Sequence, residues 1–198
     1  MRSPLAEALA ALGATLRSLR VRWYLFGAQA ALLYGASRLT ADVDVTVQLG
    51  NRESKNLVRA LESAGFDLRV RDIADFVAKT RVFPFVHSRS GMPIDIVLAG
   101  PGLEELFFGR RRRRTIDGVP VFVASPEDIV VMKVLAGRGK DEDDTVAILA
   151  AQRRLNLRQI RTTLQVLGRA VNRSDLVPRF EKLVVRARRP TSSLRTPS

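Results

Sequence analysis

Residues 25–48 read Leu25-Phe-Gly-Ala-Gln-Ala-Ala-Leu-Leu-Tyr-Gly-Ala-Ser-Arg-Leu-Thr-Ala-Asp-Val-Asp-Val-Thr-Val-Gln48. The residue types predict, in order, the end of a strand, a turn of small residues, a short helix, a basic loop and a second strand. From Asp42 onward polar and apolar residues alternate, so Asp42 and Asp44 fall on one face of the second strand and the valines on the other. Two carboxylates on one strand face lie about 7 Å apart along the backbone, and this spacing allows them to hold a common divalent cation.

The residues before this pair favour a phosphate-bearing ligand. Gly27 and Ala28 open the short helix, and the free N–H groups of a first helical turn can hold a phosphate. Arg38 and Thr40 lie in the basic loop and are suited to further phosphate oxygens. An Asp-x-Asp motif by itself usually marks a solvated strand face. Its combination with a glycine turn and a basic loop is much less common and favours a functional site.

A third candidate carboxylate lies in the apolar run Pro93–Leu98. Alternation places Ile94 and Ile96 on one face of this predicted strand and Asp95 on the other. A carboxylate buried there without a partner would cost several kcal/mol. Asp95 therefore needs a cation, a hydrogen-bond network or an exposed face.

These motifs carry a family resemblance. Gly27-Ala28 followed by Arg38-Leu-Thr-Ala-Asp42-Val-Asp44 resembles the head of the nucleotidyltransferase fold of the DNA polymerase β superfamily. Members of that superfamily place a Gly-Gly or Gly-Ser turn before an Asp-x-Asp strand, and a third aspartate on a later strand. The closest likeness is to the stand-alone AbiEii-toxin-like and DUF6036-type nucleotidyltransferases, whose helical half residues 125–144 resemble. The matched segments span about residues 20–150.

The resemblance implies an α+β architecture with the nucleotidyltransferase fold: a small mixed β-sheet flanked by helices, followed by a C-terminal helical bundle. The corresponding boundaries are an α/β core over residues 1–124, a helical region over 125–185 and a basic tail over 186–198. The tail is rich in Arg, Pro, Ser and Thr and is expected to be disordered. The active site is expected in the cleft between core and helices.

The resemblance also assigns roles. It implies that Asp42, Asp44 and Asp95 are catalytic and bind two Mg²⁺ or Mn²⁺ ions, with Asp95 taking the proton of the acceptor hydroxyl. The residues expected to bind the NTP substrate are Gly27, Ala28, Arg38, Thr40, Lys133, Lys140 and Asp141. Ala28 departs from the usual second Gly or Ser of the turn, so a side-chain hydroxyl to the phosphates is missing while the backbone N–H groups remain.

The residues of the helical half also have a plainer interpretation. Ser125-Pro126 is a helix-start pattern, and Lys133 lies off the apolar stripe that follows it. Asp141 and Asp144 come at the start of a further helix, where acidic side chains are favoured by the helix dipole alone.

Two basic features are ambiguous. The run Arg110, Arg111, Arg112, Arg113 and Arg114 is typical of a solvated loop, or alternatively of a contact with RNA or an acidic partner. His87 is the single histidine, and a surface position is favoured over a role as general base.

Composition bounds the classes of function. The 198 residues carry 33 basic and 20 acidic side chains, for a net charge of +13, which favours nucleic acid, nucleotides or an acidic protein as partner, or reflects simple solubility. The absence of cysteine excludes disulfides and thiolate metal sites. Aromatic residues make up 6%, so no base-stacking platform is evident. No apolar run is long enough to span a membrane and no signal peptide is recognisable, so a cytoplasmic location without membrane contact is expected.

Two functions remain open from the sequence. The first is a metal-dependent nucleotidyltransferase that transfers an NMP from an NTP to an acceptor hydroxyl and releases pyrophosphate. For some relatives the resemblance implies the 3′ end of tRNA as acceptor, in a toxin with a cognate antitoxin. The second is a non-catalytic nucleotide-binding or RNA-binding partner on the same fold. The nucleotide, the acceptor (RNA, protein or small molecule) and the oligomeric state stay undetermined.

Overall fold

The predicted strands pair into one mixed sheet. The structure, a computed structural model, describes residues 2–38, 40–50, 54–100 and 102–188. In chain order the elements are α1 (Pro4–Ser18), β1 (Arg22–Phe26), α2 (Gly27–Leu32), β2 (Val43–Gln48), α3 (Ser54–Ser63), β3 (Phe66–Leu68), α4 (Ile73–Thr80), β4 (Val82–His87), β5 (Met92–Leu98), α5 (Leu103–Arg110), β6 (Arg112–Ile116), β7 (Val119–Val123), α6 (Pro126–Ala136), α7 (Gly139–Ala151), α8 (Leu157–Ala170) and α9 (Leu176–Arg188).

The strand order places β2 in the interior of the sheet. The order is β3-β4-β5-β2-β1-β7-β6, with β2–β5 and β1–β7 parallel and the other neighbours antiparallel. Val43, Val45 and Val47 are fully buried, as the alternation predicts. Thr46, on the opposite face, is also buried because helices cover both faces of this central strand.

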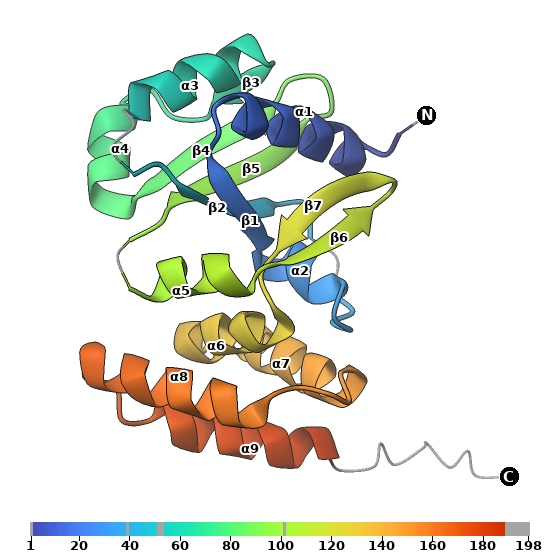
Figure 1. The fold of residues 1–198 in the computed structure, drawn as a ribbon, viewed down its shortest axis with the longest axis vertical. Coiled ribbons are helices and arrows are strands. Elements are labelled where there is room, and N and C mark those ends of the chain that lie inside the picture. Colours follow the sequence, from blue (N-terminus) through green and yellow to red (C-terminus); the bar gives the residue numbers. More distant parts are fainter. Residues whose placement is uncertain (1, 39, 51–53, 101, 189–198) are drawn as a thin grey trace, which may run out of the picture.

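Helices cover both faces of the sheet. On one face Trp23 of β1 packs against α1, where its ring lies next to Gly13. On the other face Tyr24 packs edge-on against Phe107 and Phe108 of α5, with ring centroids 6.5 and 4.8 Å apart. Figure 1 shows α1 and α3 on the far side of the sheet from α5 and α2.

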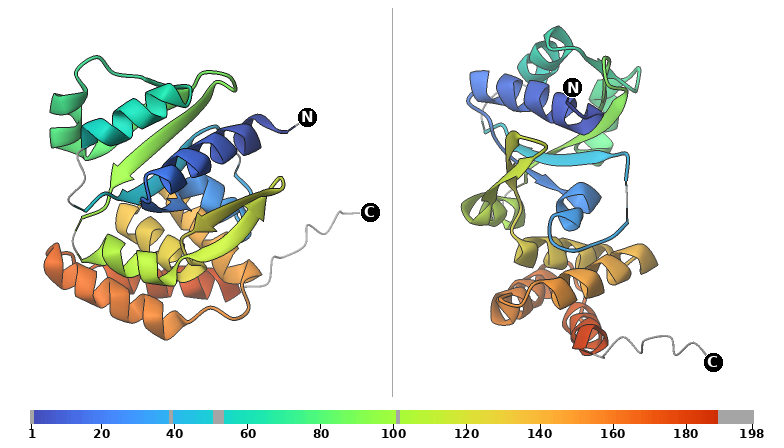
Figure 2. Two further views of the ribbon diagram at one scale, coloured as in Figure 1. Left: turned by 45° about the horizontal axis from the view of Figure 1, so that its top comes forward. Right: turned by 90° about the vertical axis from the view of Figure 1, so that its right-hand side faces the viewer.

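The helices α6–α9 stack below the sheet half, as Figures 1 and 2 show. Ser125 caps α6 by accepting a hydrogen bond from the backbone N–H of Asp128, and Pro126 follows at the first helical position. The predicted α+β architecture with a C-terminal helical bundle is confirmed.

The helical region was predicted to end at residue 185. In the structure its last helix, α9, continues three residues further, to Arg188. The rest of the predicted tail, residues 189–198, lies outside the described residues. No helix in the described ranges has the length and apolar character needed to cross a membrane.

Candidate active site

The first wall of the site is built on β2. The parallel pairing of β2 with β5 puts Asp44 directly beside Asp95, and Asp42 immediately precedes β2. Side chains of paired neighbours point to the same face, so the aspartates from two distant segments meet on one side of the sheet.

A glycine turn lies against Asp44. The antiparallel register of β1 and β2 pairs Phe26 with Asp44, and Gly27 follows with φ of 69°. A Cβ atom at position 27 would lie 1.9 Å from Oδ2 of Asp44, closer than any real contact. The position therefore requires glycine for two reasons, its left-handed backbone and the carboxylate beside it.

The second wall comes from α6 and α7. Nζ of Lys133 lies 2.6 Å from Asp144 Oδ2 and 3.3 Å from Asp141 Oδ1, and all three side chains are buried. Nε of Arg138 donates to Asp141 at 2.5 Å, and Arg38 lies 3.8 Å from Asp144. Burial works to raise the pKa of Asp141, but the hydrogen bond from Arg138 and the charge of Lys133 hold it below its usual value. The carboxylates on this wall are thus neutralised by basic partners.

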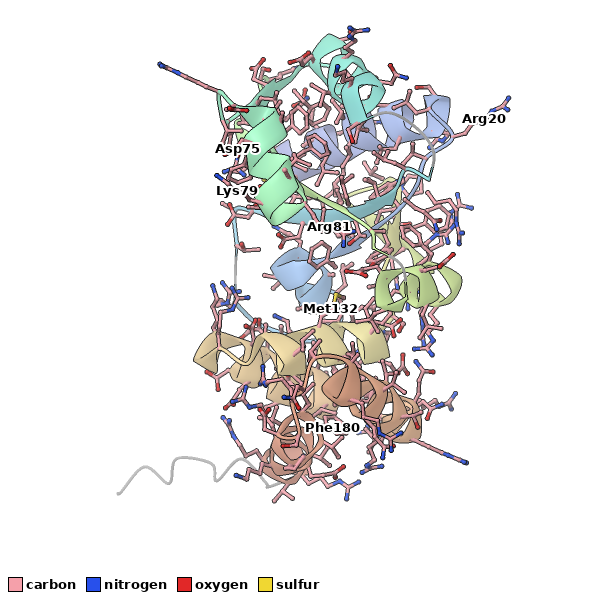
Figure 3. The ribbon with its side chains drawn as sticks, turned by 90° about the vertical axis from the view of Figure 1, so that its left-hand side faces the viewer. Arg20, Asp75, Lys79, Arg81, Met132 and Phe180 are labelled. Carbon is pink, nitrogen blue, oxygen red and sulfur yellow. The ribbon has the colours of Figure 1, made fainter. Side chains whose placement is uncertain are left out.

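The two walls enclose a pocket of about 280 Å³. Met132, which lies between the sheet half and the helical half in Figure 3, forms part of its floor. The predicted residues that line it are Gly27, Ala28, Arg38, Thr40, Asp42, Asp44, Lys133, Lys140 and Asp141.

On the acidic wall, Asp42 and Asp44 form no ion pair with any residue that the structure describes. Burial raises the pKa of Asp44 to about 6, and the negative charges of Asp95 and Asp42 add to the rise, while Lys133 and Arg138 oppose it. Asp44 is therefore partly buried beside two other carboxylates, and a cation would relieve the cost of its charge.

Asp95 is not among the residues that line this pocket. Arg69, which follows β3, forms an ion pair with Oδ1 of Asp95 and donates from Nε to the carbonyl of Phe85 at 3.1 Å. Within the described ranges, no three His, Cys, Asp or Glu side chains are grouped closely enough to hold a metal ion. The role of Asp95 as a third ligand stays a prediction.

The arginine run does not form the solvated loop that its charge favours. Arg110 ends α5 and pairs with buried Asp128 at 3.1 Å, and Arg112 begins β6 and pairs with buried Glu127 at 3.2 Å. The hairpin signal is present in the sequence as Asp117-Gly118, which forms the β6–β7 turn between Ile116 and Val119. The buried acids at the start of α6 pair with two of the arginines, while the Arg112 side chain stays 46% exposed.

His87 is another correction. It is 5% exposed, shares a 2.7 Å hydrogen bond with Ser90 and packs on Phe66 with ring centroids 4.9 Å apart. The end of β4 is covered because β3 pairs there, so the favoured surface position was wrong.

Sequence reasoning missed two arginines of this region. Arg138 lies in Gly137-Arg138-Gly139, which indicates only a chain break, yet it lines the pocket and holds Asp141. Arg69 has no local signal, because its contact with Asp95 depends on how β3, β4 and β5 pair.

Comparison with known families settles the family. The model of a nucleotidyltransferase family of unknown function, DUF6036, matches residues 5–185. The chain belongs to this family. The predicted resemblance is confirmed, although no curated protein matches the sequence significantly.

Solved structures share the fold of this DUF6036 protein at low sequence identity. An antigenic nucleotidyltransferase-like protein from Paracoccidioides brasiliensis superposes with a TM-score of 0.56 at 19% identity, over 91% of this chain and 94% of that one. The lincosamide antibiotic adenylyltransferase LnuA, bound to lincomycin, superposes with a TM-score of 0.52 at 15% identity, over 77% of this chain and 100% of that one. The antibiotic-resistance factor ANT(2'')-Ia superposes with a TM-score of 0.53 at 15% identity, over 94% of this chain and 98% of that one. The nucleotidyltransferase fold is thereby confirmed.

Proposed function

We propose that this protein transfers a nucleoside monophosphate from an NTP to an acceptor hydroxyl in the pocket between β2 and the α6–α7 pair. One observation carries the proposal. Asp42 and Asp44, which form no ion pair with the described residues, share the pocket with the basic side chains of Arg38, Arg138 and Lys140. A triphosphate with its cation has the complementary arrangement of charge, since the cation suits the acidic wall and the phosphates suit the basic one.

The acidic wall fits a magnesium or manganese ion. Asp42 and Asp44 supply the hard oxygen ligands that these ions prefer. Burial, and next the charges of Asp95 and Asp42, raise the pKa of Asp44, and a bound cation would offset this cost. When bound, such an ion neutralises phosphate charge and lowers the pKa of the acceptor hydroxyl. Asp95 joins this set only if its ion pair with Arg69 opens or shifts.

The protein's own residues then have distinct tasks. The backbone N–H groups of Gly27 and Ala28 hold phosphate oxygens, and Arg38 and Lys140 steady the phosphate charge. Asp95 takes the proton of the acceptor hydroxyl once its ion pair with Arg69 has opened. The acceptor oxygen forms a bond to the α-phosphorus, the bond from that phosphorus to the β-phosphate oxygen breaks, and pyrophosphate leaves.

For the acceptor we propose an RNA hydroxyl, as at the 3′ end of tRNA, with a toxin role and a cognate antitoxin. The net charge of +13 and the resemblance to toxin nucleotidyltransferases support this choice. The structural neighbours LnuA and ANT(2'')-Ia, an antibiotic adenylyltransferase and a resistance factor, make a small-molecule hydroxyl the competing acceptor.

The test is a transfer assay with each α-³²P-labelled NTP, Mg²⁺ and either total RNA or a hydroxyl-bearing antibiotic such as lincomycin. We expect label on a discrete RNA band, and its loss in Asp44→Asn. The control is Glu105→Gln, which removes the same charge from an exposed position on α5 outside the pocket.

Each outcome decides one point. Label on the antibiotic alone would replace RNA as the acceptor and keep the reaction. NTP binding without transfer to either acceptor would favour the non-catalytic binding partner. Equal labelling by Asp44→Asn and the parent would contradict the proposed site.

A further inference from the structure

A second basic site lies at the opposite end of β1 from the nucleotide pocket. Arg17 lies in the last turn of α1, Arg20 in the turn that follows it, Arg22 begins β1, and Arg111 follows α5. Together they line a pocket of about 250 Å³. Arg22 is five residues before Gly27, so about 17 Å of strand separates this arginine pocket from the glycine turn.

The arginine pocket is not neutralised by the protein. None of its four arginines forms an ion pair with a carboxylate in the part of the chain that the structure describes. The side chains of Arg17, Arg20 and Arg22 are exposed, and Figure 3 shows Arg20 extending from the end of α1 away from the molecule. Four like charges around one hollow repel each other, so an anion would stabilise the arrangement.

Arg111 is the most buried of the four arginines in this pocket and packs against aromatic rings. Its Cζ lies 4.7 Å from the centroid of Phe122, and Arg22 stacks on the other neighbouring ring, Phe108, at 5.1 Å. Nε of Arg111 is buried and has no hydrogen-bond partner. Burial, and next the charge of Arg22, lower the pKa of Arg111. A buried donor without an acceptor is rare in folded proteins and is expected to have a ligand or water partner.

Phe122 adds an aromatic surface to this basic site. Its side chain is 39% exposed although it is large and apolar. The register of β6 and β7 pairs it with exposed Arg113, so both side chains lie on the same face. A ring between guanidinium groups is the arrangement on which unpaired bases stack while arginines contact the phosphates.

We propose that Arg17, Arg20, Arg22 and Arg111, with Phe122, form a binding site for single-stranded nucleic acid that is separate from the nucleotide pocket. Several guanidinium groups suit several phosphates of one chain better than a single phosphate. Arg112 and Arg114 take no part, because they turn to Glu127 and Tyr34 on the other face of β6.

This inference goes beyond nucleotidyl transfer and is independent of it, since binding at the arginine pocket needs no NTP, cation or Asp44. Nucleic acid that binds at the arginine pocket without any nucleotidyl transfer would still support the inference.

The test measures fluorescence anisotropy of a labelled single-stranded RNA and of the matching DNA at about 0.1 M salt. The variant Arg17→Gln/Arg20→Gln removes two exposed arginines with no hydrogen bond or ion pair from their side chains among the described residues. Two lost phosphate contacts should weaken binding by about 25-fold and reduce the salt slope by about 1.4. Phe122→Leu should weaken it by about 5-fold or more through lost stacking.

The matched control is Arg59→Gln/Arg71→Gln, which removes the same charge from exposed positions on α3 and after β3. We expect its affinity to stay within about 2-fold of the parent, and Asp44→Asn to bind as the parent does. Equal weakening by both arginine pairs would overturn the site, because it would show a general charge effect. Complete displacement of the strand by NTP and Mg²⁺, or binding to anionic phospholipid vesicles but to neither strand, would overturn it too.

Discussion

Gly27 and Asp44 depend on each other at the level of single atoms. The turn needs φ of 69°, and Oδ2 of Asp44 occupies the space that a side chain at position 27 would take. The sequence signals the glycine and the aspartate separately, as a turn residue and as part of Asp-x-Asp. Their contact follows from the β1–β2 register, which no local pattern specifies.

Gly27→Ala should therefore be more damaging than an ordinary glycine substitution. Gly91→Ala is the matched control, because Gly91 has φ of 67° and a Cβ atom there would meet nothing within 4 Å. We expect the free energy of unfolding of the control to fall by about 1 kcal/mol because of backbone strain. That of Gly27→Ala should fall by at least about 1 kcal/mol more, as measured by urea denaturation. Equal losses would show that Asp44 moves aside without cost.

The pKa of Asp44 predicts a pH-dependent stability. Its rise from 3.8 to about 6 means that the folded state holds this proton more tightly than the unfolded state. The stability contributed by Asp44 therefore falls as pH rises from about 4 to about 6, and by pH 7 the full cost, at most about 3 kcal/mol, is present.

Asp44→Asn should remove this cost. In metal-free protein we expect the variant to melt higher than the parent at pH 7.5 and to show a clearly smaller difference at pH 4.5. Added Mg²⁺ should raise the Tm of the parent and not that of the variant. A variant that melts lower than the parent at both pH values would contradict the cost assigned to the charge of Asp44.

At the scale of elements, β6 shows where sequence patterns fail. Five consecutive arginines outweigh the Asp117-Gly118 turn signal, so the pattern favours a loop where the structure has a strand. The strand forms because alternation points Arg112 toward buried Glu127 at the start of α6, with which it pairs, and points Arg113 to the opposite face. Such pairing depends on an element that lies fifteen residues further along the chain.

The two faces of β6 should respond differently to mutation. Arg112→Gln leaves the buried carboxylate of Glu127 without its cation, and we expect a loss of about 1–2 kcal/mol in unfolding free energy. Arg113→Gln removes the same charge from the exposed face and should cost less than about 0.5 kcal/mol. Chemical denaturation compares the two directly, and equal effects would contradict the strand alternation.

At the scale of the whole molecule, the candidate active site lies between the sheet half and the helices α6 and α7, which are distant in the sequence. The sequence predicted most of the elements and nine of the pocket-lining residues because strand alternation, helix caps and the family motifs are local. It did not predict the ion pair of Arg69 with Asp95 or the pocket of Arg17, Arg20, Arg22 and Arg111, because these require the sheet order and the packing of α1 and α5.

The most direct test of the central proposal is calorimetric titration of the protein with NTP, in the presence and absence of Mg²⁺. If Asp42 and Asp44 hold a cation that anchors the triphosphate against the basic wall, NTP should bind only when Mg²⁺ or Mn²⁺ is present. The Asp42→Asn/Asp44→Asn variant should then lose at least about tenfold in affinity, while Glu105→Gln binds as the parent does. Equal affinity with and without the cation, or an unchanged affinity in the double variant, would contradict the role proposed for the aspartates.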